Sequence, residues 1–77
     1  MTVKDVYITR FDNEEKVLIR QRTGKYYDSP FGIQECYKDI YDGYVSKIPI
    51  DLFDIEVETL KPISGYENNW NIVVFCK

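Results

Sequence analysis

The sequence predicts a single two-layer α+β domain spanning residues 1–77, with its strands and helix in the order ββαββ. Two observations lead to this prediction. Short segments in which apolar and polar residues alternate flank one segment in which apolar residues recur at helical spacing. Hydrophobic residues make up 44% of the chain and charged residues 30%, as in a domain with one small core and a charged surface. We expect a four-stranded, mostly antiparallel sheet with the helix packed on one face.

The first predicted element is a hairpin between residues 2–11 and residues 16–22. The first of these segments is rich in β-branched and aromatic residues, and a turn-forming Asp-Asn pair follows it. Both of its alternating faces are apolar, since Val3 and Tyr7 fall on one face and Val6 on the other. A single helix covers only one face, so self-association through the other face is one way to bury it.

The helix is predicted after this hairpin. Ser29 is expected to cap its N-terminus, with Pro30 at the first helical position and Gly43 at the left-handed stop. Between these ends, four apolar residues follow the spacing i, i+4, i+7, i+11 of an amphipathic helix. They are Ile33, Tyr37, Ile40 and Tyr44.

The second hairpin is predicted from residues 53–57 and residues 71–75. In the first segment Phe53, Ile55 and Val57 alternate with carboxylates, which is typical of a half-buried strand with one acidic face. The acidic positions are Asp54, Glu56 and Glu58. Three carboxylates at this spacing suit a divalent cation only with a loop to wrap it, so we expect a solvated or ion-paired face. Whether this face pairs with Arg20 and Arg22 of the first hairpin or faces a partner stays open.

The sequence contains no recognisable set of catalytic residues, since carboxylates are plentiful but no spacing picks out an acid and a base. Histidine, the commonest general base and metal ligand, is absent. Cys36 and Cys76 lie far apart in the sequence and are expected to be buried, reduced thiols, with Cys36 on the core side of the helix. The segment Thr23-Gly24-Lys25 lacks the earlier glycine and the following Ser or Thr of a phosphate-binding loop. We therefore expect a non-enzymatic protein with no cofactor and no metal.

Hydropathy and charge give no sign of a membrane segment. The longest uninterrupted apolar run, residues 72–76, is far shorter than the roughly 20 residues that cross a bilayer. Lys4, Asp5 and Arg10 interrupt any secretory leader at the start of the sequence. We expect a soluble, cytoplasmic protein that has no membrane partner.

Charge and tyrosine content point to a binding surface. The net charge is −3, yet residues 1–27 carry six basic and four acidic side chains. Seven tyrosines add an amphipathic residue that protein interfaces use often. The residues expected to contact a partner are Arg20, Arg22, Lys25, Tyr26, Tyr27, Tyr66 and Trp70.

Three functions are compatible with these observations. The leading hypothesis is a small protein-binding module, such as an inhibitor, adaptor or regulatory subunit, that docks on a larger protein through aromatic and arginine side chains. The second is an RNA or single-stranded DNA binder that uses the basic, aromatic first hairpin. The third is a homo-oligomeric structural component, for which a homodimer is the simplest form.

Overall fold

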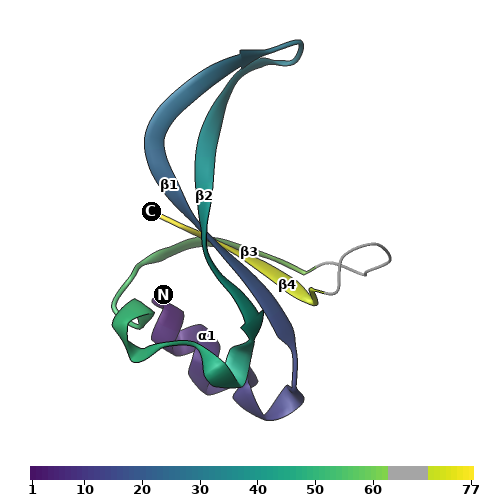
Figure 1. The fold of residues 1–77 in the computed structure, drawn as a ribbon, viewed down its shortest axis with the longest axis vertical. Coiled ribbons are helices and arrows are strands. Elements are labelled where there is room, and N and C mark those ends of the chain that lie inside the picture. Colours follow the sequence, from purple (N-terminus) through teal and green to yellow (C-terminus); the bar gives the residue numbers. More distant parts are fainter. Residues whose placement is uncertain (63–69) are drawn as a thin grey trace.

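The computed structural model describes residues 1–62 and 70–77 (Figure 1). One α-helix precedes four strands, and short 3₁₀ turns occupy residues 11–13, 45–47 and 50–52. The main elements are α1 (Val3–Arg10), β1 (Lys16–Ser29), β2 (Gly32–Tyr44), β3 (Val57–Pro62) and β4 (Ile72–Cys76). The predicted α+β class, with one α-helix and a four-stranded sheet, is confirmed.

The sheet is mixed, with the strand order β2-β1-β4-β3. Both outer pairs, β1 with β2 and β3 with β4, are antiparallel. The second pair corresponds to the predicted second hairpin, whereas the predicted first hairpin is wrong, because residues 16–22 pair with β2 and not with residues 2–11. The central pair is parallel, with Val17 of β1 opposite Ile72 of β4. The predicted order ββαββ is wrong, because the helix comes first and all four strands follow it. The connection from β2 to β3 contains only 3₁₀ turns, and it carries the chain across the sheet to the far edge.

Residues 2–11 form α1 and not the predicted strand. The backbone N–H of Thr2 donates to the Asp5 carboxylate at 2.8 Å, which satisfies a free donor at the helix start. Val3 and Val6 lie on one side of the helix and are fully buried against the sheet. These capping and packing contacts outweigh the β propensity of the segment.

The helix cap predicts an acid-sensitive contribution to stability. The pKa of Asp5 lies below its usual 3.8, first because the Thr2 backbone N–H stabilises the carboxylate. A group with a lowered folded-state pKa stabilises the fold above its unfolded pKa, and this contribution is lost as the pH falls through the folded pKa. We expect D5N to have a lower Tm than the wild-type protein at neutral pH. The difference in Tm between the two proteins should shrink as the pH falls below 3.8. Thermal melts across this range check it, and a Tm difference that does not change with pH would contradict it.

Residues 32–44 form β2, where the sequence predicted the helix. The strand pairs along β1 from Lys16 opposite Tyr44 to Ser29 opposite Gly32. A bulge interrupts the register, since Tyr41 faces Ile19 while Asp39 faces Arg20. The extra residue, Ile40, packs against the core next to Tyr41. The four apolar residues that suggested a helix share no face in the strand, since Ile40 packs against the core, Tyr37 packs edge-on against Phe75, and Ile33 and Tyr44 are exposed.

Other predicted elements are shifted or confirmed. Gly43 does not end a helix and lies within β2 opposite Val17. The predicted strand at residues 16–22 is confirmed as the first half of β1, and the predicted last strand corresponds to β4. The third strand begins later than predicted, because Phe53 and Ile55 belong to the turns before it. Their carbonyl oxygens accept hydrogen bonds from α1, at 3.1 Å from the Lys4 amide and 2.9 Å from the Val3 amide.

The hydrophobic core lies between α1, the 3₁₀ turns and one face of the sheet (Figure 1). Its buried members from the sheet are Val17, Ile19, Val57, Ile72, Val74 and Cys76. The helix and turns contribute Val3, Val6, Val45 and Ile48. Because its members from β1 are Val17 and Ile19, this core anchors only the lower half of the β1–β2 pair.

In the described part of the chain, no helix has the length and apolar character of a membrane span.

Candidate functional site

The upper half of the β1–β2 pair projects from the body as a two-stranded ribbon (Figure 1). Pairing of β1 with β4 ends at Gln21 opposite Cys76, and within the described chain β1 continues in partnership with β2 alone. We call residues 23–36 the arm. The longest dimension of the molecule, 40 Å, runs along it. An isolated two-stranded ribbon is marginally stable in water, so the arm depends on its anchored base and on anything that binds it.

A bulge sets the arm at an angle to the body. Arg22 lies opposite Tyr37, and the next pair is Tyr26 with Glu35, so residues 23–25 of β1 face a single residue of β2. Gly24 has a φ of +80°, which is accessible to glycine at little cost. The Thr23 hydroxyl donates to the carbonyl oxygen of Cys36 at 3.0 Å. The bulge is thus held closed across the ribbon and increases its local bend.

The arm ends in a tight turn formed by Ser29-Pro30-Phe31-Gly32. Proline at the second position and glycine at the fourth match the preferences of a type I turn, and Gly32 has a φ of +109°. The Ser29 hydroxyl donates to the Gly32 carbonyl oxygen at 2.7 Å and accepts from the Phe31 amide at 3.2 Å. The serine thus holds both sides of the turn and presents the Phe31 side chain to solvent.

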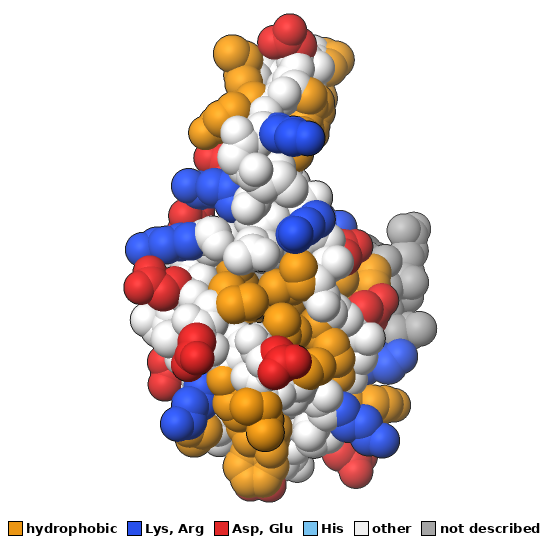
Figure 2. All heavy atoms as spheres, turned by 60° about the vertical axis from the view of Figure 1, so that its left-hand side comes forward, with side chains coloured by type: hydrophobic (Ala, Val, Ile, Leu, Met, Phe, Trp, Pro, Cys, Tyr) orange, Lys and Arg blue, Asp and Glu red, His pale blue; other side chains and the backbone are white. Residues whose placement is uncertain are grey.

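Four large apolar or aromatic side chains of the arm are exposed. The exposed fractions are 61% for Tyr26, 52% for Tyr27, 92% for Phe31 and 71% for Ile33. Figure 2 shows hydrophobic side chains gathered at the outer end of the arm. Exposed apolar patches of this kind mark interaction sites more often than scattered single residues do.

The base of the arm is charged but internally paired. Nε of Arg22 lies 2.6 Å from Glu35 Oε2, and its Nη2 lies 2.5 Å from Glu58 Oε1. The Tyr37 hydroxyl and these two carboxylates raise the pKa of Arg22 above its usual value. Arg22 therefore joins β1, β2 and β3 where the arm leaves the sheet.

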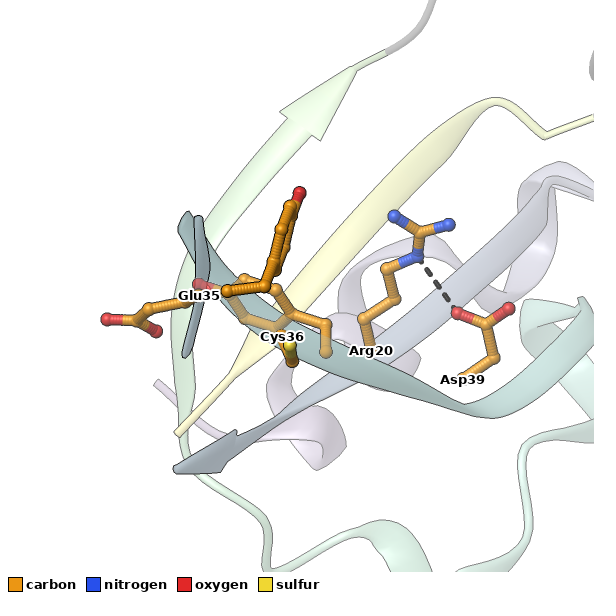
Figure 3. Close-up of a pocket in the computed structure, with 6 residues that line it drawn as sticks. Arg20, Glu35, Cys36 and Asp39 are labelled. Atoms are coloured by element: carbon orange, nitrogen blue, oxygen red, sulfur yellow. Dashed lines mark hydrogen bonds and ion pairs between the residues drawn. The ribbon is translucent and has the colours of Figure 1, made fainter. Parts of the chain in front are cut away.

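The second arginine at the base is paired as well. Arg20 Nε donates to Asp39 Oδ1 at 2.9 Å (Figure 3). The acidic face that the sequence left open thus divides, with Glu58 pairing with Arg22 and Glu56 pairing with Lys77 at 3.0 Å. The arginines and most of these carboxylates stabilise the fold locally.

An open hollow of about 380 Å³ lies beside the base of the arm (Figure 3). It is lined by residues of β1 and β2, among them Tyr27, Cys36 and Tyr37. Arg20 and Asp39 contribute their ion pair to its wall. Each charge there already has a partner, so the hollow offers no uncompensated charge to a ligand.

Trp70 lies away from the arm, on the face of the sheet opposite α1. It is half-buried, and its Nε1 donates to Asp42 Oδ1 at 2.7 Å. With Leu18, Val73 and Phe75 it lines a second hollow of about 360 Å³. Trp70 thus covers part of the sheet face and is not available as a freely exposed docking residue.

The structure brings some of the predicted contact residues together and separates others. Lys25, Tyr26 and Tyr27 are exposed on the arm. Arg20 and Arg22 form ion pairs with carboxylates at the base of the arm. Trp70 lies on the body, and Tyr66 lies outside the described residues. Sequence reasoning missed Phe31 and Ile33, which it assigned to the helix. The Ser-Pro-Phe-Gly turn between two tyrosine-rich segments was the signal that pointed to a hairpin.

Comparison with protein families, with curated proteins and with solved structures finds no match to this chain. Within residues 1–62 and 70–77, no group of three His, Cys, Asp or Glu side chains is arranged to hold a metal ion. The arm is the feature of the described structure that core packing and internal ion pairing leave unexplained.

The two cysteines predict a clear difference in reactivity. Cys76 is fully buried in the core, and burial raises the pKa of its thiol to about 11. Cys36 is half-buried in β2 and lines the open hollow beside the arm. Because the thiolate is the reactive form, we expect a thiol reagent at mildly alkaline pH to modify Cys36 in the native protein and Cys76 only after unfolding. A C36S variant that still reacts rapidly without denaturant would contradict this.

Proposed function

We propose that this chain is a small, non-enzymatic protein-binding module that docks on a larger protein through the outer end of its arm. The observation that carries the proposal is the exposure of Tyr26, Tyr27, Phe31 and Ile33 on a ribbon that projects from the core. Tyrosine and other aromatic residues are enriched at the centres of protein interfaces, where their burial contributes much of the binding energy. An inhibitor, an adaptor and a regulatory subunit would all act through such a contact.

The proposed docking role accounts for an apparent disadvantage of the exposed arm. A ribbon with apolar side chains in water and few partners is a site for unwanted association. The hydrophobic core of the body does not include the arm, since the core residues on β1, Val17 and Ile19, come before Arg22 in the sequence. Retaining this segment in a chain of 77 residues is consistent with a role in binding.

The charges of the arm favour a protein over a nucleic acid. Nucleic-acid affinity rests on basic side chains that neutralise phosphates. Arg20 and Arg22 are paired with carboxylates, and the segment from residue 23 to residue 34 carries only Lys25 and Asp28 as charged residues. The basic hairpin on which the nucleic-acid hypothesis depended is therefore largely neutralised.

Two matched isoleucine variants test the proposal. Ile33 on the arm and Ile50 on the body are 71% and 78% exposed, so I33S and I50S remove the same side chain from similar solvent environments. The tagged chain is first used to isolate a partner from nuclease-treated lysate of its native source, and the purified partner is then titrated with each variant. We expect I33S to weaken binding by about tenfold or more, as for a residue at the centre of an interface, and I50S to leave it unchanged.

Three results would contradict the proposal. Unchanged affinity in I33S, or a larger loss in I50S than in I33S, would place the main contact outside the arm. Capture that disappears with nuclease would indicate binding to RNA or DNA, which would also weaken steeply with added salt. A chain that captures no protein and forms oligomers of defined size would indicate the structural, self-associating role.

A further inference from the structure

The exposed side chains of the arm are divided between the two faces of the ribbon. Tyr26 lies opposite Glu35, Tyr27 opposite Gln34 and Asp28 opposite Ile33. Residues directly opposite one another share a face, and successive residues of a strand alternate between faces. Tyr26 and Ile33 therefore lie on one face and Tyr27 on the other. Phe31, in the turn, belongs to the tip.

This division constrains the shape of the binding partner. A ribbon that lies flat on a partner buries the side chains of one face and leaves those of the other in water. With Tyr26 61% exposed and Tyr27 52% exposed, neither face of the free arm is covered by its own body. Burying all four apolar side chains needs contact with both faces and with the tip at once. A cleft into which the ribbon inserts provides this, and a flat surface does not.

The charges of the arm constrain the chemistry of that cleft. Lys25 and Asp28 are the charged residues between residues 23 and 34, and their charges sum to zero. Asp28 lies opposite Ile33 on the face that carries Tyr26, so a cleft that buries this face must offer its carboxylate a hydrogen-bond donor. At the base, Glu35 is already paired with Arg22. A strongly charged partner surface gains nothing from this segment, and burying its charges against apolar side chains is costly. An anionic lipid surface is likewise disfavoured, since the chain has a net charge of −3 and the arm carries a single lysine.

We infer that the arm inserts tip-first into a largely apolar cleft of a partner protein, with Phe31 leading, with Tyr26 and Tyr27 contacting opposite walls, and with a hydrogen-bond donor on the wall that faces Asp28. The inference rests on the proposed function and specifies its geometry. The Ser29 and Gly32 contacts pre-form the turn, so that the tip enters with little ordering cost. The bulge at residues 23–25 marks the depth at which insertion stops, because the ion-paired base begins there.

Photo-crosslinking from each face tests the insertion. A p-benzoylphenylalanine residue is placed singly at Tyr26, at Tyr27 and, as a control on the body, at Tyr44, which is 45% exposed. Each full-length protein is irradiated with the purified partner, and the attached partner residues are mapped by mass spectrometry. We expect the Tyr26 and Tyr27 probes to attach to two different apolar segments of one protein, and the Tyr44 probe to attach to neither. With the same partner, Y26S and Y27S should each weaken binding about tenfold.

The other outcomes separate failure of the insertion from failure of the proposed function. Crosslinks from Tyr26 or Tyr27 alone, with a loss of affinity only in the matching serine variant, would show a flat contact and overturn the insertion while the docking role stands. Crosslinks from Tyr44 without any from the arm would overturn both. Crosslinks between copies of this chain would replace the partner with a homo-oligomer. Flotation of the unmodified protein with phosphatidylcholine and phosphatidylserine vesicles would assign the arm to a lipid surface and overturn the inference.

Discussion

Replacement of Ile19 by alanine is expected to reduce the free energy of unfolding by about 2–5 kcal/mol, the range observed for deletion of a buried isoleucine or leucine side chain. Ile19 is fully buried at the centre of the sheet, with Tyr41 of β2 opposite it on one side and Val74 of β4 on the other. For a chain of 77 residues the total stability is expected to be roughly 4–12 kcal/mol. The variant therefore loses a large fraction of its stability.

The control for this prediction is the same change on the arm. Ile33 is 71% exposed, so I33A removes no buried surface and is expected to alter the unfolding free energy by less than about 0.5 kcal/mol. Chemical denaturation of the two variants under identical conditions makes the comparison. Equal destabilisation would mean that the arm packs on the body in solution, and both the docking role and the insertion would lose their foundation.

Hydrogen exchange is expected to divide the single strand β1 into two parts. Residues 17–21 lie between β2 and β4, whereas residues 26–28 are paired with β2 alone among the described strands. Amides of the first group should exchange only through global or near-global unfolding, whereas the arm opens locally at much lower cost. We expect protection factors in the two groups to differ by about a hundredfold or more.

Partner binding supplies a second test within the same experiment. Saturation with the purified partner should raise protection at residues 26–28 and leave that at residues 17–21 almost unchanged. Uniform protection along β1 in the free protein would contradict the prediction, because the arm would then be as stable as the core.

Sequence reasoning identified those parts of the fold in which local pattern and tertiary position agree. The first half of β1 and the whole of β4 carry dense β-branched residues and form the buried centre of the sheet. The two errors have opposite causes. In α1 the β propensity was misleading and the Thr2–Asp5 cap was the better guide. In β2 the apolar residues fell at helical spacing by coincidence, since only Ile40 among them packs against the core while Ile33 and Tyr44 are exposed.

The candidate site was likewise predicted only in part, because residue type identified some of its residues and tertiary position decided the others. Tyr26 and Tyr27 were chosen for their residue type and lie exposed on the arm. Ile33 was assigned to the apolar face of a helix and Phe31 to its first turn, because their exposure depends on β1 continuing beyond the end of its pairing with β4. Arg20 and Arg22 were chosen for their charge, and their carboxylate partners come from β2 and β3. Such pairings are set by strand order, which the sequence left undetermined.

The parallel contact between β1 and β4 affects how the chain folds as it is synthesised. The backbone of Asn71, just before β4, bonds to that of Lys16, 55 positions earlier. If β1 and β2 pair before β4 has been synthesised, the inner edge of that hairpin is open along its most apolar residues, and the hairpin alone is marginally stable. At a translation rate of about 5–20 residues per second, this edge stays exposed for several seconds. An open apolar edge of this kind is a site for aggregation until β4 pairs with it.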